Sequence, residues 1–366
     1  MIRLISCLLM TALSAVAVAQ VKPNAPSSLC VQDTSGTSSC VNVASTGGAK
    51  KWNPGDYYRA NEQAFAYQRA ARNWVWDKVK ADPLVKGGLL VVPWGTVDKG
   101  NGVYDFSEID ADLATLKASG KRLIIEVWWM NYWHSLSSAR GSGWVPDYTI
   151  DNGCAVPAAW DSGSTAGVGY TIQLHLQKCM DNLISFYAAL AKRYDGDPNV
   201  EQIIITEPST PYATWDATQY LVQFKRLVAA VGQSWPKTTA VFYMNWFAQP
   251  GEMAAATAAA GLGIGGPDLL PSPREDDGGK ALRGSFGGNY GTTDYRGKIP
   301  VSYSFETCCT VTASQADAFA INSLKATHLA WVIQSGDPGY TLADVQAVIK
   351  ARSGKTTTAY PTSLPK

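Results

Sequence analysis

Short apolar runs alternate with segments of helical periodicity along most of this chain. The predicted strands are residues 88–94, 122–128, 202–206, 240–244, 261–266, 299–305 and 328–333, and a further strand is expected near residues 52–58. The predicted helices are residues 67–76, 107–116, 174–194, 220–231, 252–260, 313–325 and 342–351, with Ser107 as the cap of the second helix. Continuous apolar strands flanked by helices indicate a parallel sheet that is covered by helices.

The number and order of these units predict the fold class. Eight strand–helix units over about three hundred residues fit a single (β/α)8 TIM barrel, an α/β fold. A doubly wound sheet is the alternative, but it would be expected to carry a glycine-rich phosphate turn after an early strand, and the sequence has none. We expect residues 1–19 to be a signal peptide, 20–50 an N-terminal arm, 51–352 the barrel and 353–366 a C-terminal tail.

Composition narrows the classes of ligand. The chain is 46% hydrophobic and 17% charged, which excludes a disordered protein. Its 31 Lys and Arg nearly balance 30 Asp and Glu, so a formal net charge of +1 provides no basic field for nucleic acid or anionic lipid. The 13 Trp and 17 Tyr favour a flat, uncharged ligand with apolar faces, the alternative being a large aromatic core.

The N-terminus has the order of features found in a secretory signal. Arg3 precedes an apolar run that reaches the small residues 17–19, and we expect cleavage after Ala19. An uncleaved membrane anchor is disfavoured because the run is shorter than the ~20 residues that a spanning helix needs. The sequence therefore predicts a secreted or periplasmic protein with no membrane contact after cleavage.

Removal of the signal leaves an even set of cysteines, which permits full pairing in an oxidising compartment. Proximity in sequence favours one disulfide that tethers the arm and one within the barrel. The predicted pairs are Cys30 with Cys40 and Cys154 with Cys179, which leaves Cys308 and Cys309. These last two either form a vicinal disulfide beside the site, pair with distant cysteines, or stay as buried thiols. No C-x-x-C spacing is present, so a zinc site is disfavoured.

Two acidic residues directly follow predicted strands. Glu207 follows the fourth strand and Glu306 follows the seventh. Because the chemistry of such barrels takes place at the carboxyl ends of the strands, both carboxylates are expected in the same mouth. Cleavage of a glycosidic bond needs two such groups, one to protonate the leaving oxygen and one to attack or to activate water. The alternative is that they are strand-end caps or ion-paired carboxylates.

The stretches Trp-Gly-Thr-Val at 94–97, Gly-Val-Tyr-Asp-Phe-Ser-Glu-Ile-Asp at 102–110 and Gly-Lys-Arg-Leu-Ile-Ile at 120–125 resemble strands two and three of retaining (β/α)8 glycoside hydrolases. These belong to the clan A type, whose catalytic glutamates follow strands four and seven. The resemblance covers roughly residues 50–352 and assigns no numbered family. It implies that Glu207 is the acid/base, that Glu306 is the nucleophile and that Trp331 floors the cleaved subsite. One departure is Thr206, since the clan usually has an Asn there that binds the sugar 2-hydroxyl.

Other residues at predicted strand ends are candidates for binding sugar. Rings there either stack on pyranose faces or pack within loops, and polar side chains either bind hydroxyls or cap loops. The candidates after the second, third and fifth strands are Trp94, Trp128, Trp129, Asn131, Trp133, His134 and Trp246. Asn245 either replaces the missing asparagine or caps a loop, and Asp268 either orients the nucleophile or binds sugar. Glu126, inside an apolar strand, is expected to pair with another polar group within the barrel.

These observations predict an exported glycoside hydrolase that cleaves a polysaccharide or oligosaccharide by a retaining double displacement. The sequence lacks the His-Glu-x-x-His and Gly-x-Ser-x-Gly motifs, which disfavours a metal hydrolase and an esterase, and no cofactor is expected. The alternative function is a non-catalytic carbohydrate-binding barrel, which Thr206 keeps open. The sugar, its linkage and the oligomeric state do not follow from the sequence.

Overall fold

The computed structural model describes residues 48–59, 69–130, 140–141, 143–158, 169–208, 216–245, 247–271, 275–284, 287–305, 311–333 and 339–365, and the backbone of 28–32 and 38–42. Eight parallel strands form a closed barrel, in which each strand pairs with the next along the chain and the last pairs with the first. They are β3 (Gly55–Arg59), β4 (Gly87–Pro93), β7 (Arg122–Trp128), β10 (Val200–Ile205), β11 (Thr239–Tyr243), β12 (Gly263–Gly266), β13 (Val301–Phe305) and β14 (His328–Val332).

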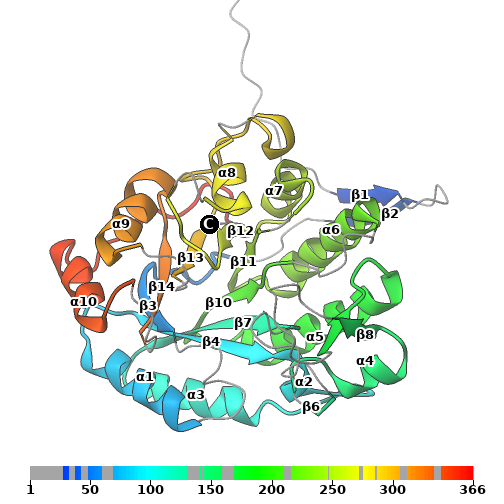
Figure 1. Cartoon of the computed structure of the whole chain (residues 1–366), viewed down its shortest axis with the longest axis horizontal. Helices are drawn as coiled ribbons and strands as arrows, with labels where there is room; N and C mark the ends of the chain where they lie inside the picture. The colour runs from blue at the N-terminus through cyan, green and yellow to red at the C-terminus, as the bar shows by residue number, and fades with distance from the viewer. Residues whose placement is uncertain are drawn as a thin grey trace, which may run out of the picture.

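Helices surround the strands on all sides of the barrel (Figure 1). They are α1 (Arg69–Ala81), α2 (Trp94–Val97), α3 (Ser107–Lys117), α4 (Asp147–Asp151), α5 (Gln177–Tyr194), α6 (Ala217–Ser234), α7 (Pro250–Ala259), α8 (Asp277–Arg283), α9 (Ala313–Ala318) and α10 (Leu342–Ala351). Among the described residues, three antiparallel pairs lie outside the barrel: β1 (Ser28–Gln32) with β2 (Ser38–Asn42), β5 (Asp98–Gly100) with β6 (Val103–Tyr104), and β8 (Ala155–Ala158) with β9 (Gly169–Ile172).

The predicted TIM barrel is therefore confirmed, and the strand expected near 52–58 is its first strand. One local prediction is wrong. Ser107 is the first residue of α3 and not its cap; the Asp105 carboxylate accepts a hydrogen bond from the Ser107 backbone N–H at 3.0 Å. The helix predicted over 313–325 is confirmed, with α9 continuing directly into a π-helical segment, Phe319–Leu324, whose turns are wider than those of an α-helix.

Side chains of the first strand alternate between the two faces of the barrel wall. Arg59 points into the barrel, where it forms an ion pair with Glu126 of β7. Tyr58 points outward, and its hydroxyl donates to Asp82, just beyond α1. Asp56 also points outward and accepts hydrogen bonds from Arg352, which follows α10. Paired residues on neighbouring parallel strands point to the same face, so each residue of β14 points the same way as its partner on β3.

A charged cluster closes the amino-terminal end of the barrel. Glu201 of β10 accepts the backbone N–H of Asn53 at 2.6 Å and pairs with Arg122 and with His328, the latter at 3.2 Å. The C-terminal segment lies over this end, where the Tyr360 hydroxyl accepts a hydrogen bond from the backbone N–H of Lys50 at 2.9 Å. A site can therefore form at the other end of the barrel, where the carboxyl ends of the strands lie; we call this end the mouth.

The short strand β12 consists mainly of glycine, and the packing around it explains why. Gly266 faces the buried Asp276, which caps α8 by accepting the Gly279 backbone N–H at 2.6 Å. A Cβ at Gly266 would lie only 1.8 Å from Asp276 Oδ2. Burial raises the pKa of Asp276 well above its ordinary value. This glycine therefore lets α8 sit directly against the barrel wall.

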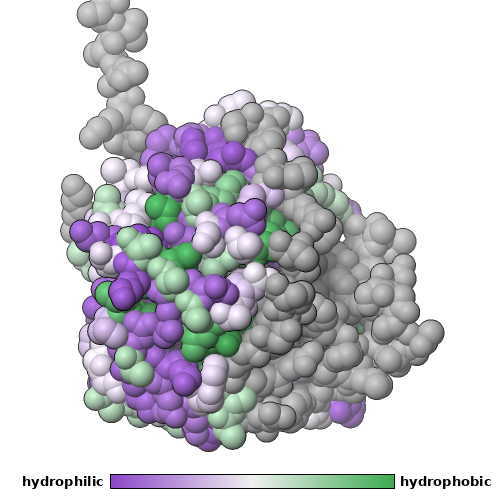
Figure 2. All heavy atoms as spheres, turned by 60° about the vertical axis from the view of Figure 1, so that its left-hand side comes forward, coloured by the Kyte–Doolittle hydropathy of each residue, from purple (hydrophilic) through white to green (hydrophobic). Residues whose placement is uncertain are grey.

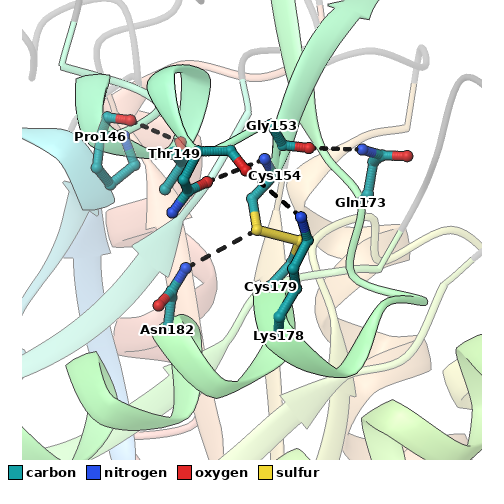
Figure 3. Close-up of a disulfide and its surroundings, with 9 residues drawn as sticks. Pro146, Thr149, Gly153, Cys154, Gln173, Lys178, Cys179 and Asn182 are labelled. Carbon is teal, nitrogen blue, oxygen red and sulfur yellow. Dashed lines mark hydrogen bonds between the residues drawn. A yellow bond between two sulfur atoms is a disulfide. The ribbon is translucent and has the colours of Figure 1, made fainter.

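A disulfide joins Cys154 to Cys179 and confirms one predicted pair (Figure 3). It connects the segment after α4 to the first turn of α5, and the Asn182 side chain lies beside its sulfur. It does not tether the N-terminal arm. In the β1–β2 pair the backbones of Cys30 and Cys40 lie opposite each other, and their bond stays a prediction.

The face shown in Figure 2 is mostly hydrophilic, with small and separate hydrophobic patches among the coloured residues. Trp74 and Val103 are the large apolar side chains classed as exposed in the described part of the chain. Within that part, we find no helix with both the length and the hydrophobicity to cross a membrane.

Candidate active site

Glu207 lies just beyond the end of β10, the fourth strand of the barrel. Its carboxylate Oε2 accepts a hydrogen bond from Nδ2 of Asn245 at 2.8 Å. Asn245 follows β11 at the equivalent position, and the two side chains are only 7% and 6% exposed. An amide donor fixes the orientation of the carboxylate that accepts from it. The contact therefore places Glu207 at the barrel mouth in a defined orientation.

Thr206, which precedes Glu207, is turned into the barrel. Its hydroxyl Oγ1 donates to Oε1 of Glu126 at 3.2 Å, and Thr206 is fully buried. Glu126 thus has the polar partner inside the barrel that the sequence predicted. The prediction that Thr206 contributes to substrate binding is not supported by this geometry, because its hydroxyl contacts the floor of the mouth.

Arg59 and Trp128 complete the surroundings of Glu126. The indole Nε1 of Trp128 donates to Glu126 Oε1 at 2.7 Å, and Nη2 of Arg59 lies 3.7 Å from Glu126 Oε2. The Arg59 guanidinium carbon is 5.5 Å from the centre of the Trp128 ring, within the range of a cation–π contact. The Trp128 ring therefore belongs to the floor, at only 2% exposure, and does not offer a free face to a sugar.

A second polar contact lies inside the barrel. The Tyr243 hydroxyl on β11 lies 3.1 Å from Oγ of Ser304 on β13, and both are buried. Burial raises the pKa of Tyr243, so it remains neutral at all physiological pH values. The interior therefore combines hydrogen-bonding groups with branched apolar side chains, since Val91 and Ile204 pair with Glu126 in the strand register and face the same side.

Two predicted aromatic platforms, Trp94 and Trp129, are buried in the wall. The Trp94 indole donates to Asp98 Oδ2 at 2.9 Å, and its ring is 6.0 Å from that of Phe186 on α5. Trp129 lies against Phe224 of α6, with ring centres 6.3 Å apart. Both tryptophans are fully buried. These two predictions are therefore corrected to core packing, since neither ring can reach a ligand in the mouth.

Trp331 also lies outside the mouth. It pairs with Tyr58 in the register of β14 and β3, and so points outward toward the helices. Its indole Nε1 donates to Asp56 at 2.8 Å, and its ring stacks on Phe305 with centres 3.6 Å apart. Trp331 is fully buried. The expected subsite floor is therefore a packing residue, because the strand register directs this position away from the barrel axis.

Asp268 lies beside the end of the seventh strand. It forms an isolated antiparallel bridge with Phe305, the last residue of β13. The Tyr340 hydroxyl donates to the Phe305 carbonyl at 2.9 Å from the opposite side. The backbone immediately before Glu306 is therefore held from two directions. Whether the Asp268 side chain orients the nucleophile or binds sugar remains a prediction.

Several predicted residues lie outside the described part of the chain. They are Asn131, Trp133, His134, Trp246, Glu306, Cys308 and Cys309. Their predicted roles stay predictions. Among the described residues, no three His, Cys, Asp or Glu side chains are grouped so that they could hold a metal ion.

Sequence reasoning missed Arg59. Its strand was expected only from residues 52–58, so the residue fell just beyond the predicted end. The signal that could have found it is alternation: with Tyr57 facing the barrel interior, Arg59 must face it too. A buried arginine then requires a carboxylate, and Glu126 was already predicted to need a partner.

No protein-family model matches the chain, and no curated protein sequence matches it. Solved structures do match in fold. The catalytic domain of a beta-amylase from Paenibacillus polymyxa matches with a TM-score of 0.54 and 9% identity, covering 86% of this chain and 100% of that one. A beta-mannanase from the blue mussel Mytilus edulis matches with a TM-score of 0.51 and 7% identity, covering 86% of this chain and 98% of that one.

An endo-glycoceramidase II from a Rhodococcus species matches with a TM-score of 0.50 and 11% identity, covering 82% of this chain and 77% of that one. At identities this low the likeness establishes the architecture. The chain thus has the closed (β/α)8 barrel fold found in these glycoside hydrolases, as the resemblance in its second and third strands implied.

Proposed function

We propose that the protein is an exported glycoside hydrolase that acts on a polysaccharide or oligosaccharide with retention of configuration. The observation that carries the proposal is the placement of Glu207 at the end of the fourth strand, with Asn245 donating to it at 2.8 Å. Glu306 directly follows the seventh strand and supplies the second carboxylate. The named enzymes that share the fold support a carbohydrate as the substrate class.

In the proposed reaction, Glu207 protonates the glycosidic oxygen of the leaving group while Glu306 attacks the anomeric carbon. A covalent glycosyl–enzyme intermediate forms, and the aglycone departs. Glu207, now ionised, removes a proton from water, which attacks the same carbon and restores both glutamates. The Asn245 amide keeps the Glu207 carboxyl group oriented through both steps.

The proposal of export rests on the order of charge, apolar run and small residues before Gln20. The disulfide between Cys154 and Cys179 is consistent with an oxidising compartment, where such bonds persist.

The experiment that tests this function is a screen of the purified protein on galactans, mannans, starch and glycolipid glycans. Wild-type protein and the variants Glu207→Ala and Glu306→Gln are compared. Glu252→Ala is the matched control, since Glu252 is an exposed glutamate that pairs with Lys225 on the helical surface. We expect hydrolysis by the wild type and the control, and a loss of about a hundredfold or more in both active-site variants.

Two results would contradict the proposal. Wild-type activity in both glutamate variants would remove their catalytic roles. Binding of a glycan by the wild type without any release of product would favour the carbohydrate-binding alternative.

A further inference from the structure

We propose that Glu126 is a positioning residue for Glu207 and acts through Thr206, an inference that rests on the proposed function. Glu126 lies on β7, the third barrel strand, while Glu207 follows β10, the fourth. The Thr206 hydroxyl donates to Glu126 Oε1 at 3.2 Å. Since Thr206 and Glu207 are adjacent, this bond anchors the backbone from which the acid/base side chain extends.

Glu126, which accepts from Thr206, is itself held in place by its neighbours. Trp128 donates to the same Glu126 oxygen at 2.7 Å. Glu126, Arg59 and Thr206 are all fully buried. A carboxylate with so little access to water is stable only when charge and hydrogen bonds compensate it, and the Arg59 guanidinium at 3.7 Å provides the charge. The three strands β3, β7 and β10 are thereby joined directly beneath the reacting group.

Glu207 is thus held at two points. Asn245 fixes the carboxylate from the β11 side, and the Thr206–Glu126 bond fixes the backbone from the β7 side. Removal of either point lets the carboxyl group rotate away from the leaving oxygen. An acid/base misplaced by about 1 Å costs up to about a hundredfold in rate. The loss of kcat/KM falls on substrates that need protonation in the first step, because a good leaving group departs without it.

Thr206→Val tests the inference, since valine keeps the volume and removes the hydroxyl. We expect kcat/KM on a substrate with a poor leaving group to fall by about tenfold to a hundredfold. On an aryl glycoside with a good leaving group kcat/KM should fall much less, while kcat and KM should fall together because release of the intermediate still needs Glu207 as the base. Thr206→Ser restores the donor and should recover most of the lost rate. Glu126→Gln should show the same dependence on the leaving group.

Thr171→Val is the matched control. Thr171 is a buried threonine on β9 whose hydroxyl has no hydrogen-bond partner. Its replacement should leave the rates of hydrolysis of both substrates unchanged. Equal losses of kcat/KM on both substrates in Thr206→Val, or no loss at all, would overturn the positioning role while the activity of the wild type upholds the proposed function.

A crystal structure of Thr206→Val tests the positioning role separately from the proposed function, because it needs no substrate. We expect the distance between Asn245 Nδ2 and Glu207 Oε2, 2.8 Å in the native chain, to lengthen beyond hydrogen bonding. An unchanged contact would overturn the inference, even if the wild-type protein proves to hydrolyse no glycoside.

Discussion

Nδ2 of Asn245 lies 2.8 Å from Oε2 of Glu207, and this contact joins the ends of the fourth and fifth barrel strands. The NH2 group of Asn245 can only donate, so Oε2 of Glu207 is the acceptor of this hydrogen bond. A proton carried by Glu207 is therefore directed to Oε1. The side chain of Asn245 thus selects which oxygen of the acid/base faces the leaving group.

Replacement of this amide by a carboxyl group should change the pH dependence of catalysis. In Asn245→Asp a like charge faces Glu207, which raises the pKa of Glu207 and keeps it protonated to higher pH. We expect the alkaline limb of the kcat/KM profile to move up by about one pH unit. Asn199→Asp, at the closed end of the barrel, is the control. An alkaline limb that stays in place in Asn245→Asp would show that the contact does not act on the catalytic proton.

Trp331 should behave as a structural residue. Trp331→Phe keeps the stacking on Phe305 but removes the donor to Asp56, a fully buried carboxyl group. We expect the free energy of unfolding in urea to fall by about 2 kcal/mol. KM should not change. A large rise in KM with unchanged stability would instead restore the role of subsite floor.

Stability should rise with pH above about pH 8. Burial lowers the pKa of Lys50 and of Lys51 from 10.5 to about 8. Between these values the unfolded chain binds protons that the folded chain does not, so the free energy of unfolding increases with pH. Near pH 10 the trend should reverse, because unfolded tyrosines ionise there while burial raises the pKa of Tyr57 in the folded state.

Urea unfolding between pH 7.5 and pH 9.5 measures this effect. In Lys50→Met the rise should be roughly half that of the native chain, since one of the two lysines is gone. A native chain whose stability stays flat or falls over this interval would show that these lysines are not desolvated.

Cys308 and Cys309 should be linked to each other. Cys154 and Cys179 are already paired, which removes them as partners. Mass spectrometry of non-reduced proteolytic fragments should find one peptide that contains both Cys308 and Cys309 with a mass two hydrogens below the dithiol. A fragment that links either one to Cys30 or Cys40 would exclude the vicinal bond, and an unchanged dithiol mass would indicate free thiols.

The barrel could be predicted from sequence because its strands are short apolar runs at regular intervals. The run at 122–128 coincides with β7, and even the glycine-rich 261–266 includes β12. The location of Glu207 could be predicted because the sequence itself shows that this residue follows an apolar strand. Its placement at the mouth depends only on strand order, and the order is sequential.

The directions of side chains could not be predicted in the same way. Trp331 and Glu126 both lie on barrel strands, yet one points to the helices and the other to the interior. A shift of one residue reverses this direction, and strand ends are uncertain by more than that from sequence. Position along the chain therefore predicts that these tryptophans lie in the mouth, although Trp94 and Trp129 are held in the wall by Asp98 and Phe224.

The most direct test of the central claim is azide rescue of Glu207→Ala on an activated aryl glycoside, with the product analysed by NMR. Without its acid/base the enzyme should accumulate the glycosyl intermediate on Glu306, and azide should release it faster than water does. The product should be a glycosyl azide with the same anomeric configuration as the substrate. Failure of azide to accelerate turnover, or an azide product of inverted configuration, would contradict the retaining mechanism with Glu207 as its acid/base.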